Sequence, residues 1–200
     1  MNLRLVWTAV AGAASVLAVV LTIAVAELPK NGAGSSREPA QLTKAQLQMR
    51  LADSPPALAA LHAQGGELLP GGASAWRAQL QALTGLPLVV NKWASWCVPC
   101  QGERVVFQRA AASWGRRAAF LGLDSNDSAR SDAEAFLKQT PMSYPSYYDA
   151  SGALGRAVTD SSSTPVTVFV AKGGSRYIHQ GPYTSVQALE RDIERYAVGA

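Results

Sequence analysis

The sequence is poor in side chains that bind metals. Its 200 residues include only two cysteines and two histidines. Zinc takes four protein ligands, or three and a water, from Cys, His and carboxylate side chains. His62 and His179 lie far from Cys97 and Cys100 in the sequence and show no paired ligand spacing. We therefore expect neither a metal site nor a cofactor.

Charge is also scarce. Asp, Glu, Lys and Arg make up 16% of the chain, and the formal net charge is +4. Lysines and arginines are scattered, without the basic runs and interleaved aromatic residues that are typical of nucleic-acid-binding proteins. We therefore expect no nucleic-acid partner. Hydrophobic residues reach 48%, which is enough for the core of one ordinary domain with a modest extension.

The N-terminus contains a long stretch without charge, residues 5–26. At about 1.5 Å per residue, a helix over this stretch crosses a hydrocarbon core of about 30 Å. We therefore interpret residues 1–26 as a signal anchor, a single transmembrane helix that holds the rest of the chain at the cell membrane and outside the cytoplasm. The alternative is a signal peptide that is cleaved after Ala26 to give a secreted form, because Ala24-Val25-Ala26 has the small-x-small form of a cleavage site.

Composition divides the remainder of the chain into three parts. Residues 27–40 are rich in Gly, Ser and Pro, which predicts a flexible linker. Residues 41–85 carry helix signals, among them a capping box from Thr43 to Gln46, and predict a short helical extension. Residues 86–200 form the third part and hold both cysteines.

Short β-branched runs alternate with helical patterns in residues 86–200. A capping box from Ser131 to Glu134 predicts the start of one of these helices. We expect strands at 86–93, 118–124, 166–171 and 176–180, and helices from the cysteines to Trp114, from about 131 to 139 and after Thr184. This order predicts an α/β domain with a mixed central sheet that is flanked by helices on both faces.

The two cysteines lie in the motif WASWCVPCQGE, residues 93–103. Within one chain they can pair only with each other, and thiols oxidise readily outside the cytoplasm. A disulfide across two intervening residues closes a very small loop. Because so small a loop constrains the unfolded chain very little, a purely structural disulfide would contribute little stability.

A reactive pair of thiols is favoured instead. A strand that ends near Trp93 and a helix that begins near Cys97 place the first thiol at a helix N-terminus. Unpaired N–H groups and the positive end of the helix dipole favour thiolate over thiol at that position. Cys97 is therefore the predicted nucleophile, and Cys100, one turn further along, is predicted to resolve the mixed disulfide.

Three neighbouring positions leave alternatives open. Glu103 is either a solvated surface carboxylate or a proton acceptor for Cys100. Trp96 either packs inside the protein or, as we favour for a loop residue before the nucleophile, shields the disulfide or docks the partner at the surface. Thr164-Pro165 precedes a predicted strand, and the general preference of X–Pro bonds predicts a trans peptide bond there.

The segment NKWASWCVPCQGE after a hydrophobic strand, with STPVTVFV about sixty residues later, resembles the TlpA/ResA-type thioredoxin-like proteins. The resemblance covers about residues 86–197, and these proteins are membrane-tethered, extracytoplasmic relatives of thioredoxin. It implies a thioredoxin-like fold with Cys97 and Cys100 as the nucleophilic and resolving thiols. It also implies a cis Thr164–Pro165 bond that faces the disulfide, backbone pairing of Thr164 with the bound partner, and a proton-transfer role for Glu103.

The same resemblance implies that residues 126–158 form the insertion that separates this group from plain thioredoxins. Members mostly reduce disulfides, often in apocytochrome c before haem attachment, and draw electrons from a membrane thiol transporter. We therefore predict an extracytoplasmic thiol:disulfide oxidoreductase that reduces protein disulfides. The alternatives are a thiol oxidant of the same fold, because WCVPC does not define the direction of electron flow, and a thioredoxin-like copper or zinc carrier that uses both thiolates.

Overall fold

The computed structural model describes residues 40–70 and 72–199. The predicted anchor, residues 1–26, and all but the last residue of the predicted linker lie outside the described residues. Within the part that is described, no helix is both long and apolar enough to cross a membrane. The helices and strands, in chain order, are α2 (Lys44–Arg50), α3 (Pro56–Ala63), β1 (Leu68–Leu69), α4 (Ala73–Ala82), β2 (Leu88–Trp93), α5 (Val98–Trp114), β3 (Ala119–Ser125), α6 (Arg130–Lys138), β4 (Ser146–Asp149), α7 (Ala153–Thr159), β5 (Val166–Val170), β6 (Arg176–Gln180), α8 (Val186–Asp192) and the π-helical turn η1 (Ile193–Val198).

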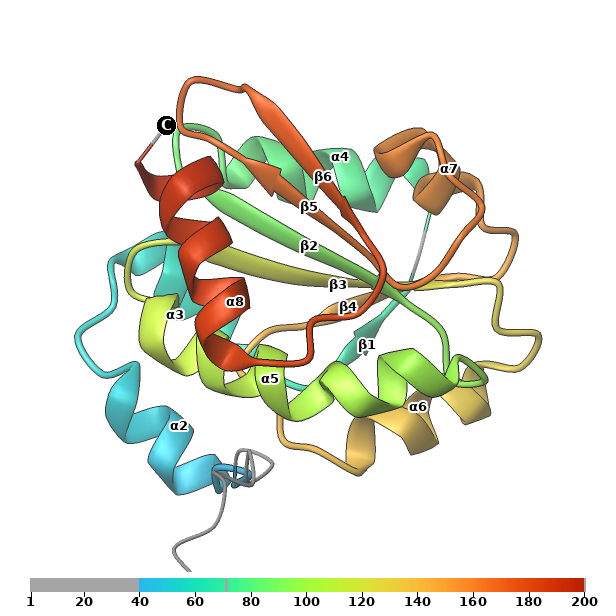
Figure 1. Cartoon of the computed structure of the whole chain (residues 1–200), viewed down its shortest axis with the longest axis horizontal. Coiled ribbons are helices and arrows are strands. Elements are labelled where there is room, and N and C mark those ends of the chain that lie inside the picture. Colours follow the sequence, from blue (N-terminus) through green and yellow to red (C-terminus); the bar gives the residue numbers. More distant parts are fainter. Residues whose placement is uncertain (1–39, 71, 200) are drawn as a thin grey trace, which may run out of the picture. The chain divides into compact units, whose positions relative to one another are not determined.

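The strands form one mixed sheet in the order β1-β4-β3-β2-β5-β6 (Figure 1). Strands β1, β4, β3 and β2 run parallel to one another, whereas β5 is antiparallel to β2 and β6 is antiparallel to β5. Every residue of β2 is buried. A strand that is covered on both faces needs no polar face, which explains the nearly continuous apolar run in this part of the sequence. The predicted mixed sheet is confirmed.

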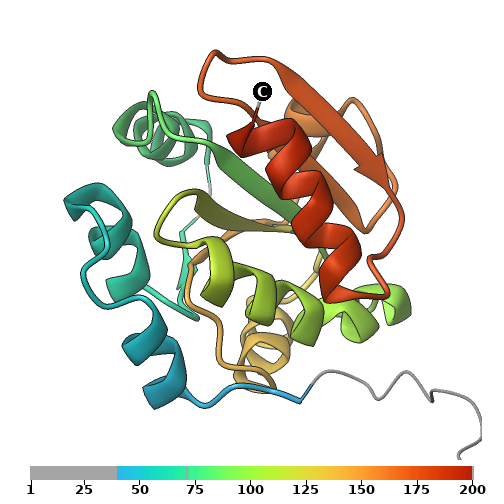
Figure 2. The ribbon, with the colours of Figure 1, turned by 60° about the vertical axis from the view of Figure 1, so that its left-hand side comes forward.

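Helices cover both faces of this sheet, and alternate strand residues point to opposite cores. Val89 packs in one core with Phe107 of α5 and Leu189 of α8. Its neighbour Val90 packs in the other core with side chains of α3, α4 and α7, among them Trp76. Figure 2 shows α8 in red and α5 in yellow-green along the same side of the sheet. The cysteines lie at the start of α5, at the end of the central strand β2.

The extension that we predicted to be helical also contains a strand. Helices α2, α3 and α4 form as expected, and Thr43 closes the predicted capping box with Gln46. However, Leu68 and Leu69 form β1, which pairs in parallel with Ser146 and Tyr147 and adds an edge to the sheet. Strand β1 was not predicted, because two residues are too few for a strand pattern and the pairing partner lies far away in the sequence.

The predicted capping box at Ser131 was also wrong. Helix α6 begins at Arg130, and its N-cap residue, Ala129, provides no side-chain hydrogen bond. Glu134, which the capping box would need, accepts a hydrogen bond from Arg130 Nε at 2.8 Å instead. Arg130 also donates to the Leu68 carbonyl and so ties α6 to β1. The first residue of α6 therefore binds within its own helix and to the sheet edge.

Two polar side chains tie the extension to the rest of the domain. Gln108 of α5 is fully buried, accepts a hydrogen bond from the Leu42 N–H at 2.7 Å and donates to the Leu42 carbonyl at 2.9 Å. His62 of α3 lies between two backbone carbonyls, with Nδ1 3.1 Å from the Ser143 oxygen and Nε2 3.0 Å from the Gly115 oxygen. These contacts join α2 and α3 to segments that lie far away in the sequence.

We expect the substitution His62→Ala to lower the free energy of unfolding by about 1–3 kcal/mol, because the packed imidazole and its hydrogen bond to a backbone carbonyl are lost. Denaturant titration of the purified protein measures this change. The control is Gln64→Ala, since Gln64 Nε2 donates only to Ala60 of its own helix, and we expect a change within about 0.5 kcal/mol. Equal losses in the two variants would show that His62 does not fasten the extension.

Candidate active site

Cys97 and Cys100 form a disulfide at the first turn of α5, with an S–S distance of 2.03 Å and a Cα–Cα distance of 5.2 Å. Cys97 is the N-cap residue of this helix, and its Sγ accepts a hydrogen bond from the Cys100 N–H at 3.2 Å. Pro99 sits in the first turn, where its missing N–H leaves no hydrogen bond unmade. The structure therefore places the first sulfur at the helix start, where we predicted it.

This position has a chemical consequence for the reduced pair. The first N–H groups of a helix have no partners within the helix, and the positive end of the helix dipole lies beside them. Both effects stabilise a thiolate at Cys97, because its sulfur accepts a hydrogen bond from one of these groups, the Cys100 N–H. The Cys100 sulfur belongs to the first turn itself and faces the protein interior.

The disulfide lies just below a surface formed by exposed apolar side chains. Trp96 is 59% exposed and Val98 is 73% exposed, whereas Cys97 is only 3% exposed. The exposure of Trp96 excludes packing in the core and agrees with the surface position that we favoured. Attack by Cys97 on a partner therefore requires its sulfur to become more accessible than it is in this disulfide form.

The loop before β5 lies on the other side of the sulfurs. The Thr164–Pro165 peptide bond is cis, so the expectation from general X–Pro preferences was wrong and the expectation from the resemblance was correct. Thr164 Oγ1 lies 3.5 Å from Cys100 Sγ. Pairing of β5 with β2 explains this proximity, because Val166 is in register with Lys92, near the end of the strand that leads to the cysteines.

Glu103 is buried, so its interpretation as a solvated surface residue was wrong. Its side chain is 2% exposed, and Oε1 accepts a hydrogen bond from Asn91 Nδ2 at 2.7 Å. Oε2 accepts a second hydrogen bond from the Tyr183 N–H at 3.1 Å. Burial raises the pKa of Glu103 to about 7, although the two hydrogen bonds favour the charged form and oppose this rise. The carboxyl is therefore able to bind or release a proton near neutral pH.

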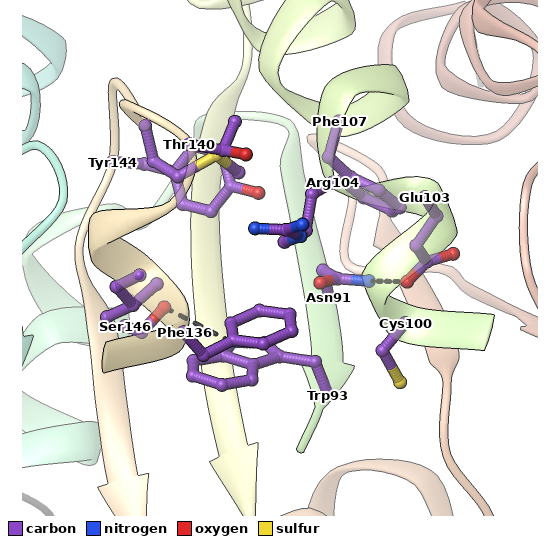
Figure 3. Close-up of a pocket in the computed structure, with 12 residues that line it drawn as sticks. Asn91, Trp93, Cys100, Glu103, Arg104, Phe107, Phe136, Thr140, Tyr144 and Ser146 are labelled. Atoms are coloured by element: carbon purple, nitrogen blue, oxygen red, sulfur yellow. Dashed lines mark hydrogen bonds between the residues drawn. The ribbon is translucent and has the colours of Figure 1, made fainter. Parts of the chain in front are cut away.

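Cys100 and Glu103 line the same small cavity, which is shown in Figure 3. Its volume is about 20 Å³, which is room for about one water molecule. The stacked rings of Trp93 and Phe136, with centroids 4.5 Å apart, form part of its wall. The carboxyl of Glu103, one helical turn beyond Cys100, therefore lies behind the disulfide and away from bulk solvent.

Sequence reasoning missed four residues that hold these groups in place. Asn91 and Tyr183 bind the two oxygens of Glu103. Asp127 accepts two hydrogen bonds from Ser95, in the loop before the cysteines. Asn91 could have been identified from the sequence, because it is an uncharged polar residue within an apolar strand. Tyr183, Ser95 and Asp127 could not have been identified in this way, because their hydrogen bonds involve distant residues or backbone groups.

The described residues contain no group of three or more His, Cys, Asp or Glu side chains that could hold a metal ion. The two sulfurs are bonded to each other in this structure. The chemistry that the arrangement supports directly is therefore the making and breaking of a disulfide, with a buried acid of near-neutral pKa beside the inner sulfur.

The sheet order, the cis-proline and the CxxC disulfide define the class of protein: the fold is thioredoxin-like. The solved structure of MTB DsbF, in mixed oxidised and reduced forms, matches with a TM-score of 0.53 and 26% identity over 58% of this chain and 85% of that chain. No protein-family model matches the chain.

Two relatives with named activities indicate which kind of thioredoxin-like protein the chain resembles. The chain is 32% identical over 98 residues to the thiol:disulfide interchange protein DsbE of Yersinia pestis and 26% identical over 107 residues to the thiol-disulfide oxidoreductase ResA of Oceanobacillus iheyensis. These matches cover 48% and 53% of this chain, and 50% and 55% of the relatives, so the chain spans about half the length of the curated relatives it matches. The predicted resemblance to TlpA/ResA-type thioredoxin-like proteins is confirmed.

Glu103 leads to a prediction about the pH dependence of stability. Its pKa is about 7 in the folded protein, against an ordinary value of 4.5. Between these values the folded state keeps a proton that the unfolded state releases, so the free energy of unfolding decreases as the pH rises through this range. The part of this decrease that is due to Glu103 is at most about 3 kcal/mol.

We expect Glu103→Gln to make this decrease smaller by the part that is due to Glu103, as measured by denaturant unfolding of the oxidised protein between about pH 4.5 and about pH 7.5. Asp124, whose pKa is raised to about 9, contributes a decrease of the same sign that this variant keeps. The matched control is Glu67→Gln, which removes an exposed carboxyl and should leave the wild-type profile unchanged. If Glu103→Gln retains the wild-type slope, the buried carboxyl does not take up this proton.

Proposed function

We propose that this protein is a thiol:disulfide oxidoreductase in which Cys97 is the nucleophile and Cys100 is the resolving thiol. The observation that carries this proposal is the Cys97–Cys100 disulfide at the N-terminus of α5, with Cys97 Sγ bound to a helix N–H group. The activities named for DsbE of Yersinia pestis and ResA of Oceanobacillus iheyensis support the same assignment.

The proposed reaction starts from the reduced pair. The Cys97 thiolate attacks one sulfur of a partner's disulfide, forms a mixed disulfide and releases the partner's other sulfur as a thiolate. Cys100 then loses its proton and attacks Cys97 Sγ, which breaks the mixed disulfide and releases the second partner sulfur. The partner gains two electrons, and the pair returns to the disulfide that this structure holds.

Glu103 is proposed to accept the proton that Cys100 loses. A base is most effective when its pKa lies near the working pH, and the pKa of Glu103 is about 7. The cavity that both residues line offers a short path for this proton, either directly or through one water.

The partner is proposed to dock over Trp96 and along the loop before Pro165. Trp96 is the large exposed side chain next to the nucleophile. The backbone of Thr164 lies just before β5, and its side chain touches Cys100. An extended partner segment that pairs with this backbone would bring its own disulfide to Cys97.

Reduction is the direction that we propose, with protein disulfides as substrates, apocytochrome c among them, and a membrane thiol carrier as the electron donor. This part rests on the resemblance to TlpA/ResA-type proteins. We propose in addition that residues 1–26 anchor the catalytic domain at the outer side of the cell membrane, because that uncharged stretch is long enough to cross a bilayer.

We expect Cys100→Ser to trap a mixed disulfide between Cys97 and its partner, because the thiol that would release the partner is missing. Non-reducing electrophoresis of cells that express the variant should show adducts that dithiothreitol removes, and mass spectrometry identifies the bound partners. The control variant Cys97→Ser should form no such adducts. If Cys100→Ser traps nothing, the proposed exchange reaction is wrong.

The reduction potential of the pair separates a reductant from an oxidant. We expect equilibration with a glutathione or dithiothreitol redox buffer to place it closer to the about −270 mV of thioredoxin than to the about −120 mV of DsbA. A value near that of DsbA would overturn the proposed direction and leave the exchange chemistry intact.

A further inference from the structure

A buried carboxylate holds the loop that leads to the nucleophile. Asp127, in the loop after β3, is 1% exposed. Its Oδ2 accepts a hydrogen bond from the Ser95 N–H at 2.9 Å, and its Oδ1 accepts one from the Ser95 hydroxyl at 2.8 Å. Both oxygens therefore bind one residue, which lies two positions before Cys97.

Further contacts hold the same two loops together. The indole Nε1 of Trp96 donates to the Asn126 carbonyl at 3.3 Å. The Tyr148 hydroxyl donates to the carbonyl of Asp127 at 3.2 Å and so connects this loop to β4. Residues 95 and 96 are consequently bound to residues 126 and 127 by three hydrogen bonds, two of which end on the Asp127 side chain.

The loop between β2 and α5 has little else to define its path. Ala94 and Cys97 close a turn through the Cys97 N–H at 3.2 Å, and Gln101 Nε2 donates to the Ser95 carbonyl at 3.2 Å. Neither contact connects the loop to another strand. The Asp127 side chain does so, because it follows β3, the neighbour of β2 in the sheet.

The environment of Asp127 supports its role as a fixed acceptor. Asp124, in β3, is fully buried, and burial raises its pKa to about 9, with further contributions from the nearby carboxylates of Asp127 and Asp149. Asp124 is therefore protonated at neutral pH and adds no negative charge beside Asp127. A carboxylate has about four lone-pair sites, which is enough for the two donors of Ser95.

We infer that Asp127 is a positioning residue for the dithiol: by fixing Ser95, its side chain holds Cys97 at the N-cap of α5 and Trp96 above it. The inference rests on the proposed function, since it concerns the same reaction. Without the Asp127 bonds, the backbone before Cys97 is free to shift, and the sulfur loses its fixed place beside the Cys100 N–H group. Small displacements of a reacting atom cost large factors in rate.

The test compares three variants of the full chain in their reduced form. Two quantities are measured: the rate at which a disulfide-bonded CxxCH peptide is reduced in a single turnover, and the rate of Cys97 alkylation by iodoacetamide as a function of pH. We expect Asp127→Ala to slow peptide reduction at least tenfold and to move the alkylation midpoint to higher pH. Ser95→Ala, which keeps the backbone bond to Asp127, should show a smaller change of the same sign.

Asp127→Asn is the variant that separates position from charge. Its amide oxygen can accept from the Ser95 N–H, and its NH₂ group can donate to the Ser95 hydroxyl, so both bonds have a replacement. We expect peptide reduction within about threefold of the wild-type rate. Asp132→Asn removes an exposed carboxylate from the neighbouring helix α6 and serves as the control for loss of charge nearby.

The inference would be overturned if Asp127→Ala and Ser95→Ala had the same rates and alkylation profiles as the wild type. An Asp127→Asn variant as slow as Asp127→Ala would overturn it as well, because charge rather than position would then matter. If Asp127→Ala does not fold, Ser95→Ala and Asp127→Asn still decide the question. A wild-type protein that does not reduce the peptide would contradict the proposed function instead, and the alkylation profiles would still report on the positioning of Cys97.

Discussion

The rest of the site depends on the start of helix α5, where the Cys100 N–H group binds Cys97 Sγ. A helix that began one residue earlier or later would present a different atom to these N–H groups. Pro99 in the first turn favours this start, and the end of β2 at Trp93 determines where the chain enters it. The sheet positions the redox pair because β2 is its central, fully buried strand.

Two buried acids surround this helix start and differ in what they can do. Glu103 lies behind the sulfurs, borders the same cavity as Cys100 and has a pKa near neutrality, so it is suited to move a proton. Asp127 lies before the sulfurs and accepts two hydrogen bonds from Ser95, so it is suited to hold a loop.

The extension contributes to the domain as a part of its sheet and core. Strand β1 pairs with β4, and Leu58 of α3 and Trp76 of α4 fill the core on the face away from α5. The ring nitrogens of His62 lie 3.1 Å and 3.0 Å from two backbone carbonyl oxygens on the domain side. Through β4 and Tyr148, the sheet edge that β1 extends also supports the loop that carries Asp127.

Much of the fold and part of the site follow from local patterns in the sequence. The apolar run of β2, the capping box of α2 and the spacing of Cys97 and Cys100 are each encoded within a few residues, so the sequence alone predicted them. The capping box at Ser131 had the same local form and failed, because Arg130 engages Glu134 and β1 instead. A local signal fails where another side chain competes for the same group, as Arg130 does for Glu134.

The sequence by itself determined that two thiols would meet at a helix start after a buried strand. Only the tertiary structure decided that Glu103 is buried between Asn91 and Tyr183, and that Ser95 binds an aspartate from the loop after the next strand. The physical reason is that burial and hydrogen-bond partners depend on which distant segments the sheet brings together. Residue types and spacing within one segment do not contain that information.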